Sequence, residues 1–233
     1  MNVRRFYPVL LFALAACTQP LPMEDETSRP PLPEASYSKA LASGAAVYRI
    51  LPAQSLILVR VGRAGKMQRL GHEHAVASED VQGLVEINED PSASRAHIVF
   101  PIRNLLVDKP EYRQRLGLDA GPSADNVAKT YTNMLKVFEP QLHPWVKAQA
   151  RLVTDEGEQL MLAVSITLHG ASFEYRLPVD LEVDIDRLVV SGKATLKHSD
   201  FGVMPFAAVG GLLRVADELE VEFRLVGRAL PRS

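Results

Sequence analysis

The stretch FEYRLPVDLEVD, residues 173–184, alternates between apolar and polar side chains along its whole length. Because successive side chains of a β-strand point to opposite faces of the sheet, this period of two predicts a long strand with one dry face and one wet face. Such a strand needs an apolar core on one side and solvent on the other. The dry face consists of Phe173, Tyr175, Leu177, Val179, Leu181 and Val183.

The same alternation recurs along most of the chain and predicts eight or nine strands. Short polar connections, at residues 154–159 and 183–187, suit hairpins between antiparallel neighbours. Closing such a sheet into a barrel removes its exposed edges, so we predict an all-β, eight-stranded antiparallel barrel. The alternating segments are residues 160–168 and 218–225 and, in weaker form, 54–61, 81–88, 95–101, 145–153 and 187–196.

One helix is predicted within this β pattern. Ser123 can cap it, Asp125 lies in its first turn, and apolar residues follow at helical spacing as far as Phe138. The long irregular loop DKPEYRQRLGLDAGP, residues 108–122, precedes it. A connection of this length in a compact domain is either a lid or binding loop, or a simple crossing of one barrel end.

The N-terminus carries an export signal. Arg4 and Arg5 precede an apolar run over residues 6–16, which is far shorter than the roughly 20 residues that span a bilayer. The run ends in LAAC, which resembles the lipobox of bacterial lipoproteins, so we predict a signal peptide over residues 1–16 and lipid modification of Cys17. The alternative is a soluble exported protein whose cysteine is incidental.

A tether and a single domain follow the signal. Residues after Cys17 are rich in proline, acids and hydroxyl groups without an apolar period, so residues 17–45 are predicted as a disordered tether and residues 46–230 as the barrel domain. The single cysteine excludes an intrachain disulfide. Removing residues 1–16 leaves 24 basic and 28 acidic residues, and the absence of a basic excess argues against nucleic acid as a partner.

The body of the chain resembles the YceI-like family of lipid- and polyisoprenoid-binding proteins. The most diagnostic pieces are TLHG at residues 167–170, SDFG at residues 199–202 and the glycine pair at residues 210–211. The resemblance covers roughly residues 48–226. It implies an extended, lipocalin-like barrel, open at one end, whose apolar interior holds an isoprenoid or fatty chain. It also implies export from a bacterial cell, with no catalytic residues established for the family as a whole.

Two histidines in RLGHEHAVAS, residues 69–78, form a Gly-His-x-His element. On a strand, His72 and His74 project to the same face, where two imidazoles could bridge a metal. Neither an HExxH motif nor paired cysteines supply further ligands. Alternatively, the pair bonds to backbone or to Asp200 and closes one barrel end, or it lines the cavity and meets a polar headgroup. The candidate ligand-binding residues are His72, His74, Arg69, His198, Asp200 and Phe201.

The sequence thus predicts an envelope lipoprotein that faces the periplasm from the outer membrane, anchored through acylated Cys17. Its extended eight-stranded antiparallel lipocalin-like barrel, with one helix and a long inserted loop, is expected to bind an isoprenoid, quinone or acyl lipid. No catalytic residue, cofactor or metal is required. The alternatives are a metal-binding protein or metal-dependent enzyme that uses His72 and His74, and a structural lipoprotein without ligand.

Overall fold

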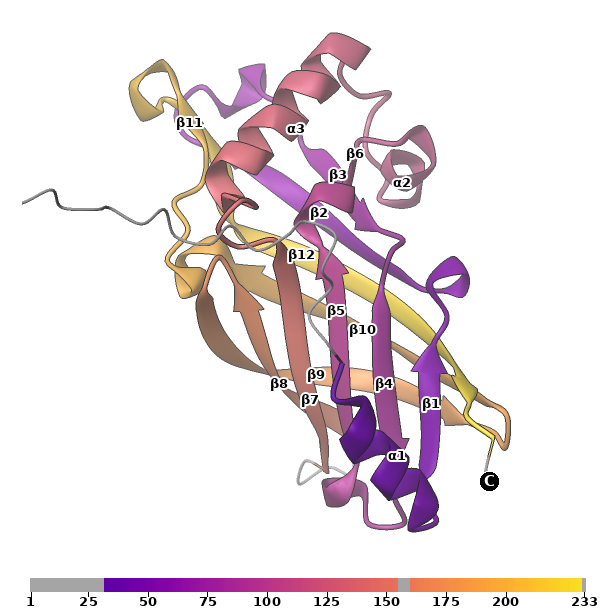
Figure 1. Cartoon of the computed structure of the whole chain (residues 1–233). Helices are drawn as coiled ribbons and strands as arrows, with labels where there is room; N and C mark the ends of the chain where they lie inside the picture. Colours follow the sequence, from indigo (N-terminus) through magenta and orange to yellow (C-terminus); the bar gives the residue numbers. More distant parts are fainter. Residues whose placement is uncertain (1–31, 155–159, 232–233) are drawn as a thin grey trace, which may run out of the picture.

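The computed structural model of the chain describes residues 32–154 and 160–231, and its centre is a closed antiparallel barrel (Figure 1). Eight strands pair in sequence around the barrel, and the last of them pairs back with the first. The predicted all-β fold with an eight-stranded barrel is therefore confirmed. In barrel order the strands are β1 (Ala46–Ile50), β4 (Gln82–Ile87), β5 (Arg95–Pro101), β7 (Trp145–Thr154), β8 (Leu160–Leu168), β9 (Ala171–Val183), β10 (Arg187–Lys197) and β12 (Leu213–Ala229).

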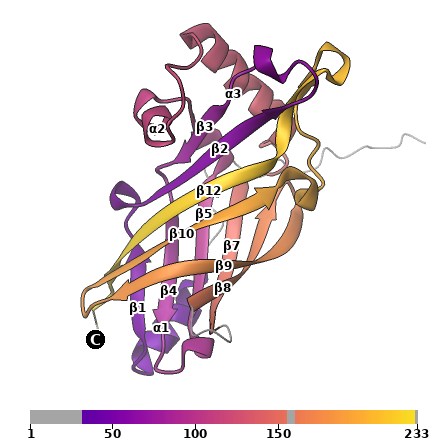
Figure 2. The ribbon, with the colours of Figure 1, turned by 180° about the vertical axis from the view of Figure 1, so that it is seen from behind.

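Strand β12 carries a second, shorter branch of the sheet (Figure 2). Its last residues pair with β1, whereas its stretch from Arg214 to Arg224 pairs with β2 (Leu56–Ala64). Strands β3 (His74–Ser78) and β6 (Leu106–Val107) extend this branch, and β11 (Ala207–Ala208) pairs with the start of β12. The branch lengthens the barrel wall on one side.

The turns follow from residue type. His169 and Gly170 join β8 to β9 with φ angles of 52° and 78°, which is the left-handed backbone of a two-residue hairpin that glycine adopts without strain. The predicted hairpin at residues 183–187 is confirmed, because the Asp184 N–H donates to the Arg187 carbonyl at 2.7 Å. In the predicted connection at 154–159, residues 155–159 lie outside the described part of the chain.

The predicted helix is present as α3 (Ala124–Phe138), and it lies at one end of the barrel (Figure 1). Ser123 occupies the N-cap position, but its side chain makes no capping hydrogen bond. Two more α-helices, α1 (Glu34–Ala42) and α2 (Pro110–Arg115), occur in the described residues. Short 3₁₀ turns are η1 (Pro52–Gln54), η2 (Gln68–Leu70), η3 (Pro91–Ala93), η4 (Ile102–Asn104), η5 (His198–Phe201) and η6 (Val209–Gly211).

The inserted loop that contains α2 lies outside the barrel wall. Leu58, Ala75 and Ala77 point outward from β2 and β3, yet all three are fully buried, because Tyr112, Leu116 and Leu118 of the insert pack over them. The insert is therefore neither a lid nor a crossing of the barrel end. It covers an apolar outer face that solvent would otherwise contact.

Helix α1 corrects the predicted extent of the tether. Residues 34–42 are helical, and the side chain of Tyr37 is fully buried against Val47 and Leu84 on the outer face of β1 and β4. The Tyr37 hydroxyl also lies 2.8 Å from His97 Nδ1. The domain thus begins before residue 46, because one aromatic anchor outweighs the polar composition around it. The predicted signal peptide, Cys17 and the tether as far as residue 31 lie outside the described residues.

No α-helix in the described parts of the chain is long and apolar enough to cross a membrane.

The docking of α1 predicts that Tyr37→Ala will lower the free energy of unfolding by about 3 kcal/mol, since it removes a fully buried aromatic ring. Hydrogen exchange should show α1 opening before the barrel. Ser38→Ala, at an exposed position of the same helix, should change stability by less than about 0.5 kcal/mol. Equal effects of the two variants would contradict the assignment of α1 to the folded domain.

Candidate functional site

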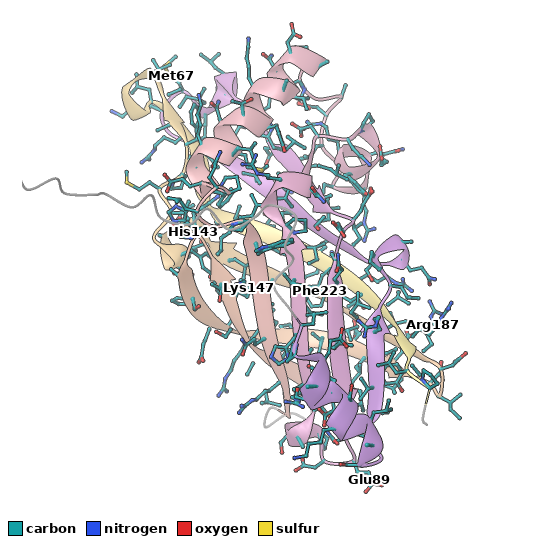
Figure 3. The ribbon with its side chains drawn as sticks, in the orientation of Figure 1. Met67, Glu89, His143, Lys147, Arg187 and Phe223 are labelled. Atoms are coloured by element: carbon teal, nitrogen blue, oxygen red, sulfur yellow. The ribbon has the colours of Figure 1, made fainter. Side chains whose placement is uncertain are left out.

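The barrel encloses a cavity of about 420 Å³. Its lining is almost entirely aliphatic and aromatic, because alternate residues of each barrel strand face inward. Phe223, labelled near the middle of the barrel in Figure 3, is one of these inward residues. Other members are Ile98, Phe100, Ala148, Ala150, Leu152, Leu162, Val164, Ile166, Val190, Leu219, Val221 and Leu225.

The strand that predicted the fold supplies part of this lining. Leu177, Val179 and Leu181 of β9 line the cavity, as its alternation predicts. The ends of the same face behave differently, because Phe173 and Val183 are 40% and 42% exposed. The apolar face of β9 therefore extends beyond the cavity at both ends of the strand.

Helix α3 lies against one end of the cavity and supplies part of its lining. The lining residues of α3 are Thr130, Asn133, Met134, Val137 and Phe138, whose spacing places them on one stripe of the helix. No residue of α3 is fully buried, although Val137 and Phe138 of the stripe also pack against the buried cluster that contains Phe201. The Tyr131 hydroxyl donates to the Arg103 carbonyl at 2.7 Å and holds the helix against the neighbouring loop.

A charge pair lies on the outer face of β4 and β5, next to helix α1. Arg95 Nε lies 2.7 Å from Glu86 Oε2, and Asn88 donates to the other carboxylate oxygen of Glu86 at 3.0 Å. The Arg95 guanidinium also stacks 4.9 Å from the centre of the Tyr37 ring. Glu86 and Arg95 adjoin the inward-facing pair Val85 and Ala96 on the same strands, so alternation points both charged side chains out of the barrel.

Both predicted histidines line the cavity, at the end near α3. His72 is exposed and precedes the strand, whereas His74 is the first residue of β3. His74 Nδ1 lies 2.6 Å from Asp108 Oδ2. The expected contact with Asp200 is wrong, because Asp200 accepts a hydrogen bond from the Tyr175 hydroxyl at 2.6 Å instead.

Asp108 organises the wall behind His74. Its side chain is fully buried, Arg113 Nη1 lies 2.6 Å from its Oδ1, and the Ala75 N–H donates to the same oxygen at 2.9 Å. Burial alone would raise the pKa of Asp108, but the hydrogen bonds from His74, Ala75 and Arg113 outweigh it and lower this pKa below its usual value. Arg113 also donates to the Glu73 carbonyl at 2.7 Å, which ties the insert to the histidine segment.

The remaining predicted residues divide between cavity and surface. His198 and Phe201 are buried and line the cavity, and the His198 ring stacks on Phe138 with centroids 6.1 Å apart. Burial lowers the pKa of His198, so its imidazole is neutral at pH 7. Arg69 is exposed and lies outside the lining, as does Asp200.

The polar lining residues that were not predicted from sequence include Ser78, Arg63 and Arg214. Ser78 is 1% exposed, and its hydroxyl has no hydrogen-bond partner among the described residues. Arg63 and Arg214 come together because β2 pairs with β12, with Val215 opposite Arg63. The alternation of β3 would have placed Ser78 on the face of His74, but no sequence signal reveals the pairing of β2 with β12.

Few side chains are placed to complete a metal site around His72 and His74. No group of three or more His, Cys, Asp or Glu side chains suited to hold a metal ion occurs within residues 32–154 and 160–231. One imidazole nitrogen of His74 is already engaged by Asp108. Binding of a metal by His72 and His74 stays a prediction, which elemental analysis of the purified protein can test.

Comparisons with known proteins found a matching protein family and solved structures with a similar fold. A family model described as "YceI-like domain" matches residues 48–227, more than half of the chain. The crystal structure of Burkholderia cenocepacia BcnA is similar, with 16% identity, a TM-score of 0.53, and coverage of 76% of this chain and 98% of that chain. A Campylobacter jejuni YCEI protein that crystallizes with large solvent channels shows 11% identity, a TM-score of 0.45, and 65% and 82% coverage. No curated protein matches the chain.

The Asp108 network predicts a strong effect of Asp108→Asn. Removing one partner of a buried ion pair leaves the buried Arg113 guanidinium with only the exposed Asp119 carboxylate as its counter-charge, so the free energy of unfolding should fall by about 3 kcal/mol in denaturant titrations. Asp119 also pairs with Arg113, but its side chain is 72% exposed, so Asp119→Asn should lower the free energy of unfolding much less than Asp108→Asn does. A larger cost for Asp119→Asn than for Asp108→Asn would contradict this account.

The lowered pKa of Asp108 also predicts a pH dependence. Its folded-state pKa lies below the unfolded value of 3.8, so its stabilisation is fully present above about pH 5 and is lost as the pH falls through the folded-state pKa. The stability gap between wild type and Asp108→Asn should be constant above about pH 5 and narrow below about pH 4. A gap that stays constant down to about pH 2 would show that Asp108 does not titrate in this way.

Proposed function

Because the chain belongs to the family of YceI-like domains, we propose that its barrel binds the apolar chain of an isoprenoid, quinone or acyl lipid. The observation that carries the proposal is the continuous apolar lining of an interior cavity, to which the stripe of α3 contributes at one end. A cavity with many apolar walls and few polar groups is typical of sites for small apolar ligands.

The free energy needed for binding is available from burial alone. Each methylene removed from water contributes about 0.8 kcal/mol, so about ten methylenes supply about 8 kcal/mol, the scale of a micromolar dissociation constant before the cost of ordering the chain. Binding of this kind needs no catalytic group. The proposal therefore assigns the chain no reaction.

Polar groups in the lining favour a ligand that carries a polar atom. The buried hydroxyl of Ser78 faces the cavity without a partner among the described residues, and an unsatisfied buried hydroxyl is costly. His74 lies on the same face of β3, two positions from Val76, which also lines the cavity. A hydroxyl or quinone oxygen on the ligand would relieve this cost, which argues against a barrel that serves only as a structural element.

The proposal includes a cellular setting, supported by the sequence. The apolar run before Cys17 and its LAAC ending favour export and acylation of Cys17. Acylation would hold the barrel at a membrane surface, and Thr18 after the cysteine favours the periplasmic face of the outer membrane. The bound lipid and the anchor would then share one membrane environment.

Filling the cavity tests the proposal. Ala148 of β7 lines the cavity, so Ala148→Trp should place an indole where the ligand lies and weaken binding of the fluorescent polyene cis-parinaric acid at least about tenfold. Wild type should bind about one molecule per chain, with fluorescence that rises on transfer from water to an apolar site.

Ala163 of β8 supplies the matched control, because it lies between Leu162 and Val164, which line the cavity, and so faces outward. Ala163→Trp should bind the polyene as wild type does. Unchanged binding by Ala148→Trp, or no binding by wild type, would refute the proposal.

A further inference from the structure

Exposed apolar side chains gather on two loops at one end of the molecule. Of the nine large hydrophobic residues that are exposed in the described chain, five lie in residues 65–72 and 203–213, which we name the tip loops. Contiguous exposed apolar groups are uncommon on soluble proteins and mark surfaces that bind a partner or a membrane. The five are Leu70, Met204, Phe206, Val209 and Leu212, and their exposure ranges from 39% to 86%.

The two tip loops are held together by backbone contacts. The Met67 N–H donates to the Leu212 carbonyl at 2.9 Å, which joins the two loops, and the Val215 N–H donates to the Phe206 carbonyl at 3.0 Å, which braces the second loop across its own base. Gly65 has a φ of 94°, and a side chain there would lie 2.3 Å from the Leu212 carbonyl oxygen, so this approach requires glycine. The exposed residues are therefore displayed on an ordered surface.

Positive charge surrounds the exposed apolar residues. Arg63, Lys66, Arg69 and Arg214 are exposed, and none forms an ion pair with a carboxylate of the described chain. Residues 61–72 and 201–215 contain no Asp or Glu, although the chain as a whole carries a formal charge of −2. The tip loops thus form a local basic and apolar surface on an acidic protein.

The tip loops also border the mouth of the cavity. Gly71 and Phe206 belong to these loops, and both line the cavity. The neighbouring Arg63 and Arg214 line it as well. Met67, labelled in Figure 3, lies at the opposite end of the molecule from Arg187, which begins β10 after the β9–β10 hairpin.

We infer that the tip loops insert into the interface of an anionic lipid bilayer, with the cavity mouth against the acyl chains. Apolar side chains ringed by Lys and Arg suit the boundary between acidic headgroups and hydrocarbon. A second copy of this chain fits the surface poorly, because a symmetric contact would set the same basic residues against one another. The inference rests on the proposed function, because insertion of the tip loops would give a membrane lipid a route into the barrel.

A single reporter cysteine in the full chain tests the inference. Cys17 is the one cysteine of the chain, so Cys17→Ser with Met204→Cys leaves one labelling site for the polarity-sensitive dye NBD. Vesicles of phosphatidylglycerol and phosphatidylethanolamine should shift the NBD emission to shorter wavelength, and lipids with a quencher on the acyl chain should quench it. Vesicles of phosphatidylcholine should give little shift, because they lack net negative charge.

The matched control is Ile185→Cys in the same Cys17→Ser background. Ile185 is 96% exposed and apolar, but it lies in the hairpin between β9 and β10, away from the tip loops. Its NBD label should not shift on anionic vesicles, even if another part of the chain attaches to them. Replacing both Lys66 and Arg69 with Ser should abolish most of the Met204→Cys shift, whereas the pair Arg187→Ser and Arg228→Ser should preserve it.

Several outcomes would overturn the inference. The first is an NBD emission at position 204 that does not shift on anionic vesicles, and the second is an equal shift at position 185. The third is a shift without vesicles that grows with protein concentration, which would indicate self-association. A shift produced by an acidic protein but not by vesicles would assign the surface to a protein partner. Uptake of cis-parinaric acid from solution is measured separately, so failure of the tip loops to insert is distinguishable from failure of the barrel to bind lipid.

Discussion

The structure depends on how β12 divides its backbone hydrogen bonds. One edge of β12 pairs with β10 along the register from Glu218 to Arg228, while the other edge is shared between β1 and β2. Pairing with β1 closes the barrel and removes the open edge that an eight-stranded sheet would expose. The close approach at this seam involves Gly227, where a Cβ atom would lie 3.0 Å from Tyr48 Cβ. Pairing with β2 then adds the branch whose inner face prolongs the cavity wall.

Closing the barrel brings the apolar faces of its alternating strands together around one interior space. Once the barrel is closed, the inward residues of each strand face one another across an apolar cavity. The Glu86–Arg95 ion pair lies on the outer face beside Tyr37, whereas Arg63 and Arg214 line the cavity and make its mouth positive. The interior therefore suits a hydrocarbon chain, and the mouth suits contact with an acidic surface. Both features follow from strand pairing and not from any single motif.

Local pattern predicted the strands, but it could not predict what covers them. The alternation around Leu177 and Val164 gives the inward residues directly, because strand periodicity is local. The resemblance to YceI-like proteins, and not periodicity, indicated a lipocalin-like barrel. Residues 56–59 are apolar on both faces, which is a signal that the outer face is covered, and α2 with its insert provides that cover over Leu58. Helix α1 was missed because its docking depends mainly on one residue, Tyr37, within a polar segment.

Only part of the site was predicted, because sequence patterns report local structure and not which distant segments meet. His72, His74, His198 and Phe201 do line the cavity, yet the partner of His74 is Asp108 from the insert, which no spacing in the sequence reveals. The central claim is that the barrel interior holds one apolar lipid. Native mass spectrometry of the full chain, purified without detergent exchange, tests it most directly. The account predicts a species heavier than the protein by the mass of one lipid, which collisional activation releases. A spectrum of protein alone, unchanged after incubation with isoprenoid and acyl lipids, would contradict it.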